Sequence, residues 1–92
     1  MTGLEQLKND IKRMLVEDLM LQIGVDEIAD DQPLFGPRSL GLDSVDALQL
    51  VVALDKAYGL KITDAARARA VLGSVNDIAA AVQEHQAANV GH

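Results

Sequence analysis

Ser44 is the side chain whose surroundings best suit a chemical modification. It directly follows Asp43 and a glycine-containing loop, and it stands at the start of a segment with helical periodicity. Backbone N–H groups in the first turn of a helix lack intrahelical partners, and the helix dipole favours a negative group there. A phosphodiester on the Ser44 oxygen would therefore be tolerated at this position. Asp43 is suited to cap the same turn.

Ser44 lacks the machinery of a catalytic serine. A nucleophilic serine needs an adjacent base that a third group holds in place. The two histidines, His85 and His92, both stand in the last eight residues, and no paired carboxylates stand out. The sequence has no cysteine, which excludes a disulfide framework, a thiolate metal site and a cysteine nucleophile. We therefore predict that the chain is not an enzyme and that Ser44 is either a passive acceptor or only a helix cap.

The segment 44–58 predicts a helix that is apolar on two faces. One face follows the spacing i, i+3, i+4, i+7, i+11 that is typical of a buried side, and Gly59 is expected to end the helix. A second stripe lies roughly 140° from the centre of the first. Such a helix is either buried twice or offers one face to a partner, and both outcomes are open. The core face is Ala47, Leu50, Val51, Leu54 and Tyr58; the second stripe is Val45, Leu48 and Val52.

Three further helices are predicted along the chain, and their apolar faces can pack against the core face of segment 44–58. Residues 4–21 carry apolar side chains at helical spacing and predict a long amphipathic helix, with Gly24 as its stop signal. Thr63 or Asp64 can cap a short helix over residues 65–72. Ser74 opens a last helix. The predicted buried positions of the first helix are Leu4, Leu7, Ile11, Met14 and Leu15, and those of the last helix are Val75, Ile78, Ala79 and Val82.

These elements predict an all-α fold: a small bundle of three main helices plus one short helix. A long loop, residues 22–42, joins the first and second helices and contains three glycines and two prolines. Loops of this length inside a compact domain are often functional. Residues 1–84 form the predicted domain, and residues 85–92 lose the helical pattern and are expected to be a flexible C-terminal tail. The loop has four apolar residues that we expect to pin it to the core: Ile28, Leu34, Phe35 and Leu40.

Composition narrows the possible partners. The chain has 92 residues with 49% hydrophobic and only 2% aromatic side chains, so aliphatic residues must build one small core. Its formal net charge of −6 repels nucleic acid and favours partners that present lysine and arginine. The N-terminal residues are too charged for a signal peptide, and no apolar run is long enough for membrane insertion. We expect a cytoplasmic monomer.

Residues 40–62 resemble the modification motif and recognition helix of acyl carrier proteins. The family pattern has glycine, a variable or hydrophobic residue, aspartate, the modified serine and a leucine-like residue; here these are Gly41, Leu42, Asp43, Ser44 and Val45. An acidic, aliphatic helix follows and ends in an aromatic residue and an isoleucine, as it does in the family. The resemblance is weaker but consistent over the order of the helices in residues 1–84, and it favours the acyl over the peptidyl type of carrier.

The resemblance implies a specific function for Ser44. A separate phosphopantetheinyl transferase, using coenzyme A and a divalent cation, would attach 4′-phosphopantetheine to it. The thiol of that arm would carry acyl groups as thioesters to acyl-transferring, condensing or modifying enzymes of fatty-acid, polyketide or related synthesis. Asp43 would serve as a helix cap or in recognition by the transferase. The implied partner-facing positions are Val45, Leu48 and Val52, with the acidic residues Asp46 and Asp55.

The sequence also departs from the family pattern. Gln49 replaces a common glutamate, the connection before the motif is long, and the short third helix carries Arg67 and Arg69 where many housekeeping carriers are acidic. Like charges there would repel a basic partner. This favours a specialised carrier over the general one of fatty-acid synthesis, unless the two arginines only form a solvated face. The alternative function is an unmodified helical protein-interaction module with the same fold.

Overall fold

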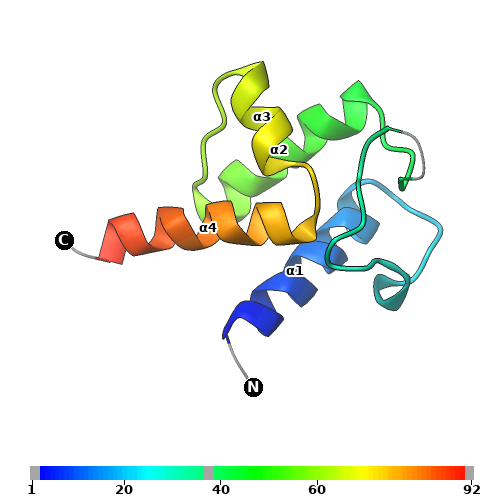
Figure 1. Cartoon of the computed structure of the whole chain (residues 1–92), viewed down its shortest axis with the longest axis horizontal. Helices are drawn as coiled ribbons and strands as arrows, with labels where there is room; N and C mark the ends of the chain where they lie inside the picture. Colours follow the sequence, from blue (N-terminus) through cyan, green and yellow to red (C-terminus); the bar gives the residue numbers. More distant parts are fainter. Residues whose placement is uncertain (1–2, 37–38, 91–92) are drawn as a thin grey trace.

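The computed structural model describes residues 3–36 and 39–90, and these residues form an all-α fold without strands. Helix α1 packs against both α2 and α4, and the short helix α3 packs against α4 (Figure 1). The predicted bundle of three main helices and one short helix is therefore confirmed. The helices are α1 (Gly3–Asp18), α2 (Ser44–Tyr58), α3 (Ala65–Val71) and α4 (Val75–Val90), with a 3₁₀ turn, η1 (Val25–Glu27), in the long loop.

The core is aliphatic and draws on every helix. The predicted stripes of α1 and α4 face it, and in α2 the side chains of Leu50 and Leu54 are fully buried. Three other predicted core residues of α2 are only partly buried but pack against the same cluster: Ala47, Val51 and Tyr58. Burial of aliphatic side chains stabilises the fold by roughly 1.5–3 kcal/mol each. The fully buried large side chains are Ile11, Leu15, Ile28, Leu34, Leu50, Leu54, Val75, Ile78 and Val82.

Helix α1 ends earlier than its pattern predicts. It stops at Asp18, because Met20 takes a left-handed conformation with φ of 54°. The Leu21 N–H then donates to the Val16 carbonyl at 3.0 Å, which is the six-to-one bond of a Schellman ending. The predicted stop at Gly24 is therefore wrong: a non-glycine residue, Met20, already ends the helix four positions earlier, and Gly24 is instead the N-cap of η1.

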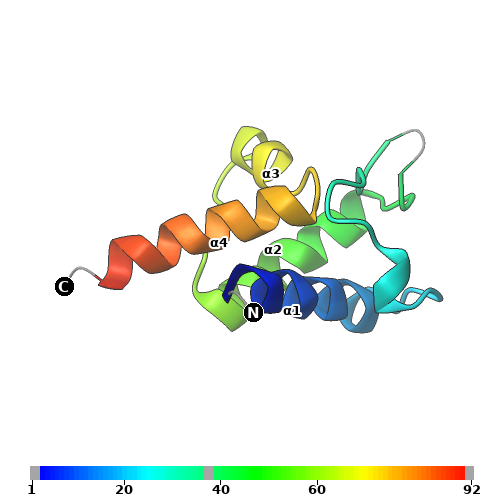
Figure 2. The ribbon, with the colours of Figure 1, turned by 60° about the horizontal axis from the view of Figure 1, so that its bottom comes forward.

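The long loop is held against the connection between α3 and α4 (Figure 2). The Leu34 N–H donates to the Gly73 carbonyl at 3.1 Å, and the Asn76 N–H donates to the Asp30 carbonyl at 2.9 Å. The predicted anchors Ile28 and Leu34 are buried, with exposed fractions of 1% and 0%. The other two predicted anchors, Phe35 and Leu40, are partly buried and pack against the core.

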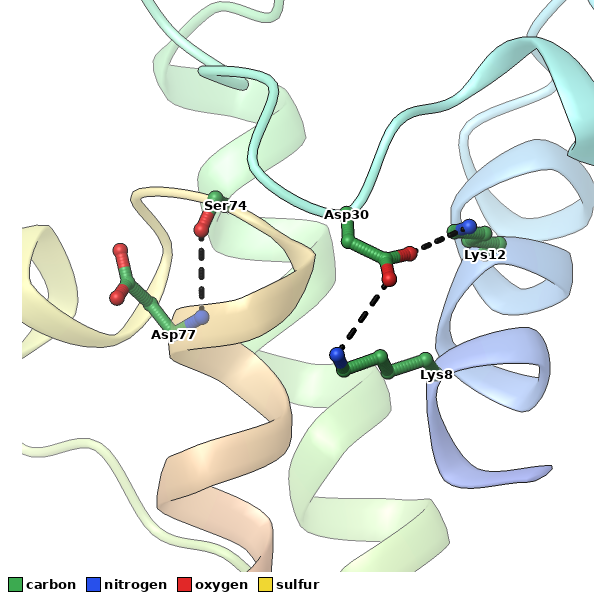
Figure 3. A network of polar contacts seen from close by, with 5 residues as sticks. All are labelled: Lys8, Lys12, Asp30, Ser74 and Asp77. Carbon is green, nitrogen blue, oxygen red and sulfur yellow. Dashed lines mark hydrogen bonds and ion pairs between the residues drawn. The ribbon is translucent and has the colours of Figure 1, made fainter. Parts of the chain in front are cut away.

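Asp30 also ties the loop to α1 through its side chain (Figure 3). One carboxylate oxygen lies 2.6 Å from Lys12 Nζ and the other lies 3.4 Å from Lys8 Nζ. The hydrogen bond from Lys12 holds the pKa of the Asp30 carboxyl below its ordinary value, although partial burial opposes the effect.

Helix α4 continues past Glu84, where the sequence pattern ends. Residues 85–90 are helical although they carry no helical pattern in the sequence, because helix propagation needs no apolar face once the helix has begun. Residues 91–92 of the predicted tail lie outside the described residues, and the flexibility of residues 85–92 stays a prediction. No helix in the described part of the chain is both long and apolar enough to cross a membrane.

The Asp30 ion pairs predict a pH-dependent stability. We expect Asp30→Asn to lower the free energy of unfolding at pH 7 by about 0.5–1 kcal/mol, since solvent screens a carboxylate that is 42% exposed. This is a loss of about 2–8 °C in Tm, measured by circular dichroism. Because the folded pKa of Asp30 lies below 3.8, the difference from wild type should persist down to that pH and vanish as the pH falls further.

Asp31→Asn is the matched control for this variant. It removes the same charge from the next residue, whose exposed side chain makes no ion pair within the part of the chain that the structure describes. An equal loss of stability in both variants would show that net charge, not the Lys8 and Lys12 contacts, is responsible.

Candidate functional site

Ser44 is the first residue of α2, and a reciprocal pair of hydrogen bonds fixes the helix start. The Asp46 N–H donates to Asp43 Oδ1 at 3.0 Å, and the Asp43 N–H donates to Asp46 Oδ2 at 3.1 Å. This is a capping box with aspartate at both positions, and it confirms that Asp43 is the N-cap. Ser44 itself does not cap the helix, so its side chain is left for another role.

The loop before Ser44 sets the direction in which the helix begins. Gly41 has a φ of 78°, which side-chain-bearing residues rarely adopt, and Leu42 is buried with an exposed fraction of 7%. The Leu42 N–H donates to the Leu34 carbonyl at 3.2 Å, and these contacts hold the last turn of the loop on the core. These contacts therefore hold Asp43 and Ser44, at the start of α2, in a defined position relative to the core.

The Ser44 hydroxyl is exposed and takes part in no hydrogen bond with the residues that the structure describes. His85 lies on α4 beside Gly59 and does not line the surface around Ser44. His92 lies outside the described residues. The described residues that line the surface around Ser44 contain no histidine, and the role of this serine as a passive acceptor stays a prediction.

A pocket of about 470 Å³ opens beside Ser44. Residues from two parts of the chain line it: the part from 35 to 47, which runs from the long loop into the first turn of α2, and the part from 68 to 73, which runs from the end of α3 into its connection to α4. The wall is apolar apart from a polar edge, and the small side chains of Ala47 and Ala68 help to keep the space open. The lining residues are Phe35, Leu42, Asp43, Ser44, Ala47, Ala68, Arg69, Leu72 and Gly73.

The sequence does not predict this pocket. Phe35 and Ala47 were interpreted only as packing residues, and both also line the pocket. The one usable signal in the sequence is that the core face of the second helix begins with the small residue Ala47, which leaves room next to Ser44.

The two arginines of α3 lie on different sides of that helix. They are two positions apart, which separates them by about 200° around the axis. Arg69 lines the pocket beside Ser44, whereas Arg67 lines a depression near Gly59 and Glu84. Both are exposed, and neither forms an ion pair with the residues that the structure describes. The two arginines are therefore solvent-exposed at two separate positions, and their effect on a basic partner stays a prediction.

The second apolar stripe of α2 is exposed. Val45, Leu48 and Val52 have exposed fractions of 61%, 64% and 44%. This settles one open question: the helix is buried on one side only, and its second apolar face is free. With Met20, these three are the exposed large hydrophobic residues of the described chain. Isolated apolar side chains on a surface are ordinary, but a stripe of three on one helix face is typical of an interaction site.

The acidic residues predicted to face partners already have contacts within the chain. Asp46 is half-buried and serves in the capping box. Asp55 lies 3.5 Å from Lys61 Nζ in an exposed pair, which contributes little to stability and can be given up on docking. Asp43 is exposed despite its capping role, so its second oxygen can still face a partner.

Two comparisons with known proteins bear on this arrangement. A family model described as the phosphopantetheine attachment site matches residues 9–82. A curated acyl carrier protein from Sulfurovum sp. (strain NBC37-1) is 35% identical over 58 residues, which are 63% of this chain and 72% of that protein. The matched range of the family model includes Ser44, the whole pocket and the exposed stripe.

The capping box predicts different effects for two substitutions of Asp43. Asp43→Ala removes the acceptor for the Asp46 N–H and should lower the free energy of unfolding by about 0.5–2 kcal/mol. Asp43→Asn keeps a good N-cap oxygen, so its stability should stay within a few tenths of a kcal/mol of wild type. Urea unfolding followed by circular dichroism measures both. Equal losses would mean that the carboxylate charge, not the hydrogen bond, stabilises the helix start.

Proposed function

The chain belongs to the family of phosphopantetheine-bearing acyl carrier proteins, and on that premise we propose that Ser44 is the residue to which 4′-phosphopantetheine is attached. The observation that carries the proposal is the setting of this serine: an exposed hydroxyl without a hydrogen bond among the described residues, at a capped helix start, on the edge of an apolar pocket. The family supplies the cofactor and implies a transferase and acyl-handling enzymes as partners.

Attachment requires an external enzyme. The Ser44 oxygen would form a new bond to the phosphorus of the pantetheine phosphate in coenzyme A, and the nucleotide part of coenzyme A would leave. The serine proton would pass to a base of the transferase, because the described surroundings of Ser44 contain no histidine. A divalent cation brought with coenzyme A would balance the phosphate charges. This chain contributes an accessible hydroxyl, placed at the helix terminus where a negative group is favoured.

The pocket fits the arm that the family carries. Its apolar wall would accept methylene groups next to the attachment point, and its polar lining residues are Asp43, Ser44 and Arg69. A volume of about 470 Å³ is within the range of small-molecule sites, so part of the arm or of an acyl chain could leave water there. The thiol at the end of the arm would supply the thioester chemistry when the group is attached.

The stripe of Val45, Leu48 and Val52 is proposed as the surface that docks the transferase and the acyl-handling enzymes. It begins one residue after Ser44 and runs along the same helix, so a partner seated on it would reach the attachment point. Asp43, Asp46 and Asp55 would meet basic groups of the partner. We propose that the carrier serves fatty-acid, polyketide or related synthesis in the cytoplasm, where coenzyme A is available, and that the departures at Gln49 and Arg69 favour a specialised pathway.

Attachment can be measured by intact-protein mass spectrometry. Incubation with coenzyme A, Mg²⁺ and a broad-specificity phosphopantetheinyl transferase should add the mass of one phosphopantetheine to wild type and none to Ser44→Ala. Ser39→Ala is the matched control, since Ser39 is the nearest other serine and should not affect the mass gain. If wild type gains no mass with several transferases while its binding to a partner survives Ser44→Ala, the chain is an unmodified interaction module instead.

The docking stripe can be tested with the same reaction. Leu48→Glu should leave helicity unchanged because Leu48 is 64% exposed, yet it should lower the kcat/KM of the transferase at least about tenfold. Ala57→Glu adds the same charge to an exposed position of α2, roughly 150° away from the stripe, and should have little effect. Equal loss in both variants would point to net charge and contradict docking through the stripe.

A further inference from the structure

We propose that Arg69 binds the phosphodiester of the arm on Ser44 and so biases the first part of the arm toward the pocket. The inference rests on the proposed attachment at Ser44. Its basis is that Arg69 and Ser44, 25 positions apart in sequence, line one pocket from two different helices.

The negative charges around Ser44 would repel a phosphodiester there, and a nearby cation would reduce this repulsion. The first turn of α2 already has two carboxylates, Asp43 and Asp46, locked together by the capping box. A phosphodiester on Ser44 adds a third negative charge within the same turn, and the helix dipole offsets only part of the repulsion. Asp43 and Arg69 are the charged residues among those that line the pocket, so Arg69 is its one cation.

Arg69 is available for this contact. Its side chain is exposed and forms no ion pair within the described part of the chain. The Asp77 carboxyl lies nearby, against Gly73, and does not pair with it. A guanidinium presents a planar set of N–H donors that matches two phosphate oxygens at once, which a flexible ammonium does less well.

The contact would direct the arm. The Ala68 and Leu72 side chains line the pocket next to Arg69, so a phosphate held there points the following methylene groups along apolar wall. Arg67 cannot do the same, because it lies on the opposite side of α3 beside Gly59 and Glu84. Arg67 is therefore a matched control for Arg69, because both arginines lie on the same helix and carry the same charge but have different surroundings.

The test compares apo and holo forms of wild type, Arg69→Gln, Arg67→Gln and Arg69→Lys, with modification verified by mass. The ³¹P NMR signal of the holo proteins should shift in Arg69→Gln and stay near the wild-type position in Arg67→Gln. The change in Tm on going from apo to holo should be about 1–8 °C less favourable in Arg69→Gln than in wild type, which is the effect of one exposed ion pair in a domain of this size. Arg69→Lys should restore part of both effects, and 1 M NaCl should remove the wild-type advantage.

Two results would overturn the proposal. Arg69→Gln and Arg67→Gln could change the ³¹P signal and the apo-to-holo Tm difference equally, or neither variant could change them; in both cases Arg69 has no special contact with the phosphate. Failure of wild type to gain mass would instead refute attachment at Ser44 and remove the basis of the inference. The circular dichroism of each apo variant separates misfolding from loss of contact, and Arg69→Lys keeps the test valid if Arg69→Gln unfolds.

Discussion

The burial of Leu34 against the connection between α3 and α4 holds the two walls of the pocket together. Its side chain is fully buried, its N–H donates to the Gly73 carbonyl, and its own carbonyl accepts from the Leu42 N–H. One residue of the long loop thus joins the segment before Ser44 to the segment after α3. Without it, Phe35 and Leu42 would lose their fixed distance from Leu72, and the pocket would have no defined shape. The loop is long because it must reach this point from the end of α1.

Helix α2 has apolar side chains both in the core and on the surface. Leu50 and Leu54 are fully buried and anchor the helix in the core, while Leu48 and Val52 remain in water. Leaving two such side chains exposed gives up about 1.5–3 kcal/mol for each one that could have been buried, a large amount for a domain whose total stability is on the order of 5–15 kcal/mol. The docking proposed for this stripe would cover these side chains intermittently and offset part of that cost.

Local signals in the sequence predict the elements well, since the physics that forms them is local. Segment 44–58 begins after an aspartate cap and ends before a left-handed glycine, and α2 has those bounds. The end of α1 could not be predicted in the same way, because Met20 adopts a left-handed conformation that residues with a side chain rarely take. The helical residues 85–90 were missed because that segment has no apolar periodicity to detect.

The same distinction between local signals and tertiary packing applies to the candidate site. Ser44, its cap Asp43 and the second apolar stripe belong to one helix and its cap, so local spacing predicts where they lie. Whether the stripe was exposed stayed open, and the modification of Ser44 followed from the family resemblance. The pocket could not be predicted, because it forms only where the loop and the α3–α4 connection are brought together by burial. The separation of Arg67 from Arg69 is an intermediate case: helix geometry alone places them on opposite sides, but which of them faces Ser44 depends on how α3 packs on α4.

The charge distribution suggests how such a carrier could both hold and release its arm. Four of the eight basic residues, Lys56, Lys61, Arg67 and Arg69, lie between positions 56 and 69 of a chain with a net charge of −6. An exposed arginine–phosphate contact is worth only about 0.2–1 kcal/mol, so it would bias the direction of the arm without locking it. A partner that binds the α2 stripe gains far more than this from burying Leu48 and its neighbours, and it could move the arm away from Arg69 at little cost. A weak contact at the phosphate is therefore better suited to a carrier than a strong one, because the arm must leave the pocket each time it serves an enzyme.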